Sequence, residues 1–500
     1  MTIETLKSAL GILHQQIMNN FGSLYGFCAA AMFVLTCLAL ISPLSKIRIG
    51  GPEAQPVMST WRWIATSVTS TVAAGLFFWC AAEPVAHLAA PSPSSGDLPF
   101  SAGAASSALG HLYLHWTLVP YAIYVVPSLV FAIAHYNRGA AAGVCATHHG
   151  VMPTQLGRLI NKKCASAAGH FTEKIAMLSL TLGIAASVGT GILMIARGAN
   201  ILGDLAGYQI TFSSMFNVTT VLLVLTCAIV ILAGRNHGIG RLASINSLIF
   251  IAIAVVVLAA GPTSFITSQS KLGIQKFFGD LFQATSGSGR EVDRAWRQDW
   301  TLFYWTAWIA WAPVTAIFLG GIARGRTVRA FLAVNFLIPA VFTGIWMSIF
   351  GSTVLYLQTS KGMPLSLEFQ KTGADAVVYM AIGALPYANI FRMIFTVLAF
   401  LSLVSLCSSA LASLSAMSSG KTHIEQQRGT VAVWSLAITI IIIAMVNGSG
   451  IEGVRMLANL GAFPMLFLQL LSGTALTIML LDPSRARWQN RTLDEPNTGV

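Results

Sequence analysis

Charged residues are scarce in this chain of 500 residues. Asp, Glu, Lys and Arg together make up 9% of it, hydrophobic residues make up 55%, and the mean hydropathy is +0.71. An ordinary soluble domain is roughly a quarter charged, and a disordered chain combines high charge with low hydrophobicity. The composition therefore excludes both classes, and we predict an all-α polytopic membrane protein.

Groups of reactive side chains are also missing. The seven cysteines form no CxxC pair, so neither a disulfide framework nor a metal site is indicated. The apolar runs lack a nucleophile–base pair and a phosphate-binding loop, which argues against an enzyme. We predict no enzymatic activity, no cofactor and no metal. A cleavable signal peptide is not indicated, because the first apolar run is too long for one.

The net charge of +12 has a topological explanation. The basic residues lie in short loops between apolar runs, as the positive-inside rule expects of cytoplasmic loops. We therefore expect a lipid bilayer around the chain and no nucleic acid as a partner. The loops that carry most of the 29 basic residues place the C-terminus in the cytoplasm. With an odd number of spans, the N-terminus is expected outside.

Apolar segments long enough to cross a bilayer, at about 20 residues per crossing, make up most of the chain. Segment 267–285 is too polar to span, and its leucine and phenylalanine spacing predicts an amphipathic helix on the outer membrane interface. We expect a loop over 90–106 and a short polar cytoplasmic tail over 482–500. Eleven spans are predicted: 23–44, 60–82, 111–136, 172–196, 213–234, 243–262, 300–323, 330–357, 387–416, 430–447 and 458–481.

Aromatic residues gather in two of these spans. Four of the twelve tryptophans fall within residues 300–311. An aromatic belt at the membrane surface accounts for Trp300, but Trp308 and Trp311 lie about 12 to 17 Å deeper along a helix. The third span adds three rings that either line one cavity or pack between helices: Trp116, Tyr121 and Tyr124.

Deep aromatic rings are the chemistry that binds a quaternary ammonium group. Such a cation has no hydrogen-bond donor, and each ring face contributes about 0.5–2 kcal/mol once water is excluded. No carboxylate is required, and the predicted spans hold almost none. One acidic residue close to the spans is Glu83, which precedes Pro84 at a span end. We expect it to snorkel toward water or cap the helix rather than contact a substrate.

Two segments of small side chains leave alternatives open. Residues 70–75 in the second span allow close helix packing or local unwinding that frees backbone groups for a ligand. The serines of residues 402–409 in the ninth span either coordinate a cation or bond back to their own helix. Packing and back-bonding are the simpler interpretations of these residues alone.

The run from Asp299 to Arg329 resembles the signature of the betaine/carnitine/choline transporter family. Its most specific part is Phe303-Tyr304-Trp305, Trp308, Trp311-Ala312-Pro313 and Arg324-Gly325-Arg326-Thr327. The resemblance extends in consistent order over about residues 23–480. Other matching parts are 42–51, 79–84, 115–124 and 238–242 with Asn246.

This resemblance implies a LeuT-like fold of two inverted five-helix repeats. The repeats are expected over 60–262 and 300–481, with 23–44 as a peripheral span within one transmembrane domain. The family usually has twelve spans, so its first helix is expected to be missing here. The resemblance also implies the inner membrane of a bacterial cell as the location, and a homotrimer as the oligomer.

The implied function is secondary active transport of glycine betaine, choline, carnitine or a related methylated zwitterion by alternating access. The implied aromatic site is Trp116, Tyr121, Tyr124 and Trp308, with Trp311 close by. The backbone of Ala73, Ala74 and Gly75 corresponds to the family's carboxylate-facing turn, and Ser405 and Ser408 to its coupling-ion region.

Departures from the family pattern leave the coupling ion open among sodium, a proton and none. Residues 405–409 lack the family's acid, and a second sodium position falls near Leu180 and Ile184, which cannot ligate an ion. One tryptophan of a family pair is replaced by Ala307, and Tyr121 stands where tryptophan is usual. These losses also motivate an alternative function, a membrane sensor that binds the same ligands without transporting them.

Overall fold

The computed structural model describes residues 3–71, 75–140, 167–232, 239–287, 291–419 and 428–489. Within these ranges the chain is helical, and its one β-type contact is an isolated bridge between Arg48 and Thr327. Ala73 and Ala74, named above as a backbone site, lie outside the described residues.

Eight helical segments of the described chain are long and apolar enough to cross a membrane, or up to ten if two bent pairs each count as one span. The chain is thus an all-α membrane protein, and the count of eleven stays a prediction. The eight are α1 (Ile3–Ile41), α4 (Ala102–Trp116) with α5 (Leu118–Ala132) and η3 (Ile133–Asn137), α7 (Ala167–Leu205), α8 (Phe212–Leu232), α13 (Val328–Leu332) with η6 (Ala333–Leu337) and α14 (Ile338–Thr359), α17 (Ala388–Ser419), α18 (Arg428–Met445) and α19 (Gly450–Leu481).

Two of the apolar segments are bent pairs of helices and not single straight helices. Helices α9 (Ile239–Ala260) and α10 (Thr263–Ser286) meet at 108°, and α12 (Thr301–Gly321), which follows α11 (Arg294–Asp299), bends by 52° after Pro313. A proline inside a helix removes a backbone hydrogen bond. The predicted span 60–82 falls on two short helices, α2 (Thr60–Thr71) and α3 (Gly75–Ala89).

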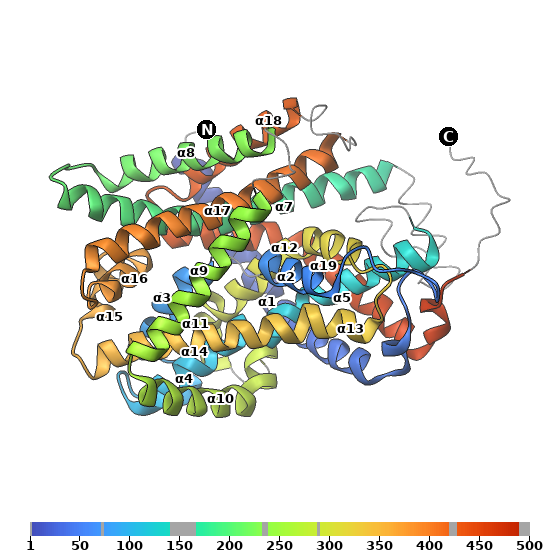
Figure 1. Ribbon diagram of the computed structural model, residues 1–500, viewed down its shortest axis with the longest axis horizontal. Helices are drawn as coiled ribbons and strands as arrows, with labels where there is room; N and C mark the ends of the chain where they lie inside the picture. The colour runs from blue at the N-terminus through green and yellow to red at the C-terminus, as the bar shows by residue number, and fades with distance from the viewer. Residues whose placement is uncertain are drawn as a thin grey trace.

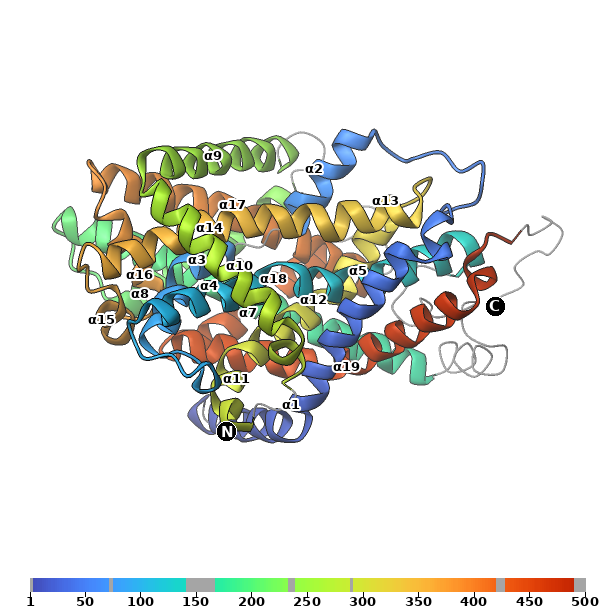
Figure 2. The ribbon, with the colours of Figure 1, turned by 90° about the horizontal axis from the view of Figure 1, so that it is seen from below.

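Helix α12 lies at the centre of the bundle, where it packs against α5, α7 and α19 (Figure 1). Helices α1 and α19 run side by side along one flank (Figure 2). The central position of α12 places its deep tryptophans among neighbouring helices instead of lipid.

The predicted amphipathic helix over 267–285 is confirmed as a helix, because α10 spans it. One face of α10 is buried against α4, with Gly273 close to the Leu109 side chain, while Phe278 and Phe282 are exposed. The loop predicted over 90–106 is wrong for residues 102–106, since α4 begins at Ala102. Ser101 caps this helix by accepting a hydrogen bond from the Ala104 N–H at 3.0 Å.

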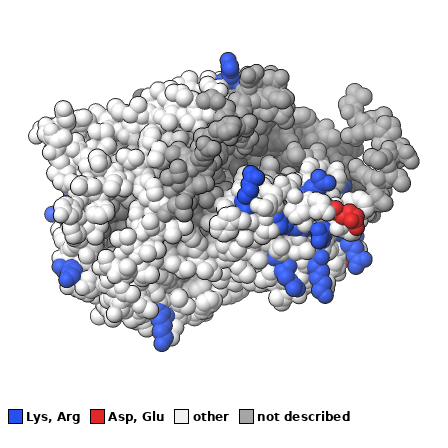
Figure 3. Space-filling model, viewed as in Figure 1, with Lys and Arg blue, Asp and Glu red and all other residues white. Residues whose placement is uncertain are grey.

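Two connections that the sequence did not link lie against each other. The Ile49 N–H donates to the Arg326 carbonyl at 2.9 Å, and the Gly325 N–H donates to the Ile49 carbonyl at 2.8 Å. Basic side chains gather in the half of the molecule that carries α13 (Figure 3). This clustering agrees with the expectation that the basic loops share one side of the membrane.

Side chains of α12 and α14 form hydrogen bonds to the backbone at the break between α4 and α5. Pro120 has no N–H to offer the Trp116 carbonyl, and that carbonyl instead accepts from the Thr343 hydroxyl of α14 at 2.8 Å. The preceding carbonyl, of His115, accepts from the Trp308 indole N–H of α12 at 3.2 Å. The backbone groups freed at the break therefore hold α12 and α14 in place.

Candidate substrate site

A cavity of about 80 Å³ lies between α3, α5, α7 and α12 and the C-terminal end of α4. Aromatic rings form much of its wall. Four of the five aromatic residues named from the sequence line it, together with Gly75: Trp116, Tyr124, Trp308 and Trp311.

The ring of Trp308 is the centre of this aromatic cluster. Its centroid lies 5.7 Å from that of Trp116, 4.9 Å from that of Tyr124 and 5.8 Å from that of Tyr121. Trp308 is 5% exposed, and the three neighbouring rings meet it at tilted or edge-on angles, the arrangements that aromatic quadrupoles favour. Tyr121 packs against Trp308 but is not among the residues that line the cavity.

Helix α7 holds Trp311 by two hydrogen bonds. Its indole N–H lies 2.7 Å from the Ser187 hydroxyl and 3.1 Å from the Gly183 carbonyl. Helices α7 and α12 approach closely here. A Cβ atom added at Gly183 would stand only 3.1 Å from the Cβ of Ala310. The orientation of the Trp311 ring is therefore fixed by α7, whose Ser187 also lines the cavity.

Gly75 lines the cavity, and its lack of a side chain leaves room beside the Trp116 ring. It is the first residue of α3, and a Cβ atom added there would lie 3.1 Å from the Trp116 ring. A larger side chain at this position can fit only if that ring moves. The glycine predicted to expose backbone thus lines the cavity, beside the ring of Trp116.

The structure adds three rings that the sequence argument did not assign to the site. Trp79, Phe303 and Tyr304 line the same cavity, and the Tyr304 ring lies 5.4 Å from Trp116 and 5.6 Å from Trp79. A signal was present for Tyr304, which stands four residues before Trp308 and so shares its helix face.

The family of this chain follows from its similarity to known proteins. A profile of the betaine/carnitine/choline family transporters matches residues 1–484. The chain belongs to this family. It is 31% identical to glycine betaine transporter 1 of Vibrio parahaemolyticus over 79% of this chain and 73% of that protein. It is 26% identical to a glycine betaine transporter of Bacillus subtilis over 96% and 91% of the two chains.

One further relative and one solved structure are also similar to this chain. An ectoine/hydroxyectoine transporter of Virgibacillus pantothenticus is 26% identical over 95% of this chain and 92% of that protein. A solved structure of a Na⁺-coupled sialic acid symporter, substrate-bound and outward-open, matches with a TM-score of 0.50 at 16% identity. The match covers 91% of this chain and 86% of the symporter chain. The predicted LeuT-like fold is confirmed, and the repeat boundaries stay a prediction.

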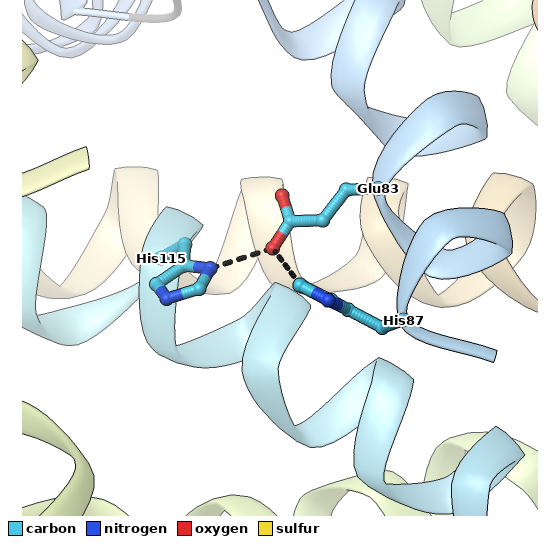
Figure 4. Close-up of side chains that lie close together, drawn as sticks. All are labelled: Glu83, His87 and His115. Carbon is cyan, nitrogen blue, oxygen red and sulfur yellow. Dashed lines mark hydrogen bonds and ion pairs between the residues drawn. The ribbon is translucent and has the colours of Figure 1, made fainter. Parts of the chain in front are cut away.

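In this family member, the expectation for Glu83 is wrong. Glu83 was expected to snorkel or cap a helix end, but α3 continues through Pro84 to Ala89 and the side chain is 0% exposed. Oε1 faces His115 Nδ1 at 2.6 Å and His87 Nε2 at 3.2 Å (Figure 4). Oε2 accepts from the Trp116 indole N–H at 3.0 Å and from the Tyr304 hydroxyl at 2.6 Å.

These contacts explain how a carboxylate is kept in the interior. A buried charge is tolerated only when hydrogen bonds and a partner compensate for lost water, and the two oxygens of Glu83 have four donors from three helices. The sequence could not show this, because the donors on α4 and α12 are distant from Glu83 along the chain.

Glu83, His87 and His115 are also of the residue types that bind metal ions. One ligand atom from each of the three lies within 4.8 Å of the others. Tetrahedral zinc ligands with bonds of about 2.0 Å stand about 3.3 Å apart, whereas the His115 Nδ1–Glu83 Oε1 distance is 2.6 Å. The side chains are thus placed to hydrogen-bond one another.

The residues named for a coupling ion lie apart from the aromatic wall. Ser405 and Ser408 are on α17, and the residue of that helix that lines the cavity is Leu406. Ser408 is 1% exposed. On α7, Leu180 and Ile184 are buried.

Proposed function

We propose that this chain is a secondary active transporter of a quaternary ammonium compound: glycine betaine, choline, carnitine or a related methylated zwitterion. The observation that carries the proposal is the ring of Trp308 with Trp116 and Tyr124 against one small buried cavity. A trimethylammonium group is bound by ring faces, each contributing about 0.5–2 kcal/mol in a desolvated site. The relatives that transport glycine betaine support the same substrate class.

Alternating access is the mechanism we propose. The repeats over 60–262 and 300–481 would rock about the cavity, and the contacts of Trp308 and Thr343 with the α4–α5 break would join them. We further propose the bacterial inner membrane as the location, a cytoplasmic C-terminus and a homotrimer. A second candidate is a non-transporting sensor, favoured by the buried apolar side chains of Leu180 and Ile184, which cannot ligate a coupling ion.

Uptake into liposomes separates these candidates. The purified protein is reconstituted and offered labelled glycine betaine, choline and carnitine, with a sodium gradient, a proton gradient or preloaded substrate. We expect accumulation of at least one compound under one of these conditions. Ligand binding without accumulation under any condition would favour the sensor. The absence of both binding and accumulation would contradict the proposed substrate class.

Replacing Gly75 by valine is expected to weaken substrate binding about tenfold. The added side chain meets the Trp116 ring at 3.1 Å, and overpacking of this kind costs about 1–3 kcal/mol. Equilibrium binding of labelled substrate measures the loss. Gly429→Val is the matched control, since nothing lies within 4 Å of a Cβ atom at that helical glycine. Equal affinities in the two variants would contradict the placement of Gly75 beside the substrate.

A further inference from the structure

We propose that Glu83, His87 and His115 form a proton-binding site whose proton competes with the substrate's positive charge. The inference rests on the proposed function, because it assigns a quaternary ammonium group to the neighbouring aromatic cavity. It is carried by three features of the described structure: a buried carboxylate that no lysine or arginine pairs with, a buried imidazole nitrogen without a partner, and two side chains shared between carboxylate and cavity.

The first feature is the charge of Glu83. Within the part of the chain that the structure describes, its ion pairs are with His87 and His115 alone, and no lysine or arginine pairs with it. The guanidinium of Arg455 lies over the Trp300 ring, but it is paired with Glu452 at 3.2 Å and Asp299 at 3.9 Å. If both histidines are neutral, one negative charge is left in the interior. A proton would balance it.

The second feature shows where that proton binds. His115 uses both ring nitrogens, Nδ1 toward Glu83 and Nε2 toward the Thr301 hydroxyl at 3.1 Å. His87 uses Nε2 toward Glu83, and its Nδ1 is buried without a hydrogen-bond partner. A hydronium ion transfers its proton to the Nδ1 lone pair of His87, so that its O–H bond breaks, the N–H bond forms and a water molecule is released. The product is an imidazolium that keeps its Nε2–H on Glu83.

The surroundings of His87 connect it to the molecular surface. His111 on α4 has its ring 5.5 Å from that of His87, and it is partly exposed. The Trp296 ring of α11 lies 4.9 Å from His87. Among the described residues, the Tyr304 hydroxyl of α12 also faces the cluster, at 2.6 Å from Glu83 Oε2. Arg455 of α19 lies over the Trp300 ring, which is itself 4.5 Å from the His87 ring. His111 is therefore the side chain through which a proton reaches His87.

The third feature links the proton to the substrate. Trp116 and Tyr304 each donate a hydrogen bond to Glu83 Oε2, and both line the cavity. An anionic carboxylate makes these rings more negative and strengthens their attraction for a cation. A proton on His87 cancels that charge, so a proton and the substrate cation oppose each other. Thermodynamic linkage makes the effect reciprocal, and substrate binding should release the proton.

Binding of choline and of glycine betaine, neither of which titrates between about pH 6 and pH 8, tests the proposal in purified protein. The wild-type Kd should rise as the pH falls, by up to about tenfold per unit where the cluster titrates. His87→Gln keeps an amide N–H for Glu83 and cannot take up a proton. Its Kd should be independent of pH. His135→Gln, distant on η3 and bonded to the Ala140 carbonyl, should retain the wild-type pH dependence.

Calorimetry of the wild type in buffers of different protonation enthalpy gives a second measurement that needs no variant. We expect release of up to about one proton per bound substrate. No proton release, proton uptake, or an unchanged pH dependence in His87→Gln would overturn the inference while the proposed function stands. Failure of both compounds to bind at any pH would instead contradict the proposed function.

Discussion

Replacing Trp308 by leucine is expected to weaken binding of choline or glycine betaine by about 30-fold or more. One desolvated ring face contributes up to about 2 kcal/mol to cation binding, which corresponds to about 30-fold in Kd. Trp308 also packs against three other rings and bonds the His115 carbonyl. Its loss therefore removes one face of the cavity and the support of the remaining rings.

Equilibrium binding and liposome uptake both measure this loss. Trp308→Phe keeps a ring without the indole N–H and should recover part of the affinity. Trp61→Leu is the matched control, because that tryptophan is 77% exposed and its replacement should leave the Kd unchanged. Normal transport by both Trp308→Leu and Trp116→Leu would show that the substrate binds elsewhere.

Replacing Glu83 by alanine is expected to lower the free energy of unfolding by about 3–5 kcal/mol. Breaking a buried, hydrogen-bonded charge pair from one side has this cost, because the remaining partners stay buried. Here four donors lose their acceptor together: His87, His115, Trp116 and Tyr304. Since these donors belong to α3, α4 and α12, the loss should loosen the packing of these helices around the cavity.

Thermal unfolding in detergent checks this expectation, with an apparent Tm several degrees below that of the wild type. Glu83→Gln retains one acceptor oxygen but turns an amide N–H toward two donors, so its Tm should fall between those of Glu83→Ala and wild type. Glu53→Ala, at an exposed position, should melt with the wild type. A Tm of Glu83→Ala equal to that of Glu53→Ala would mean that the carboxylate does not hold these helices together.

Much of the helical arrangement follows from local sequence. The apolar runs predicted the long helices, and the spacing of leucine and phenylalanine over 267–285 predicted α10. Short helices such as α15 (Leu365–Lys371) and α16 (Ala374–Ile382) were not predicted. They are shorter than a membrane span, and a search for spans does not detect them.

The candidate site also has a part that the sequence predicted and a part that depends on helix packing. The depth of Trp308 and Trp311 along one helix followed from helix geometry, and both residues line the cavity. Tyr121 was predicted to belong to the same aromatic site, but it packs against Trp308 without lining the cavity. Which ring faces the open space depends on the break at Thr117 and on the approach of α12, and the spacing of residues along α5 does not specify either.

The sequence by itself determined the membrane class, the family and the aromatic chemistry of this protein, because composition, run length and ring spacing are local properties of the chain. Only the tertiary structure decided the environment of Glu83 and the boundary of the cavity. A carboxylate before a proline is compatible with a helix end near water. It becomes a buried acceptor only when α4 and α12 bring His115, Trp116 and Tyr304 to it. Such contacts depend on packing between segments far apart in sequence, which local periodicity does not encode.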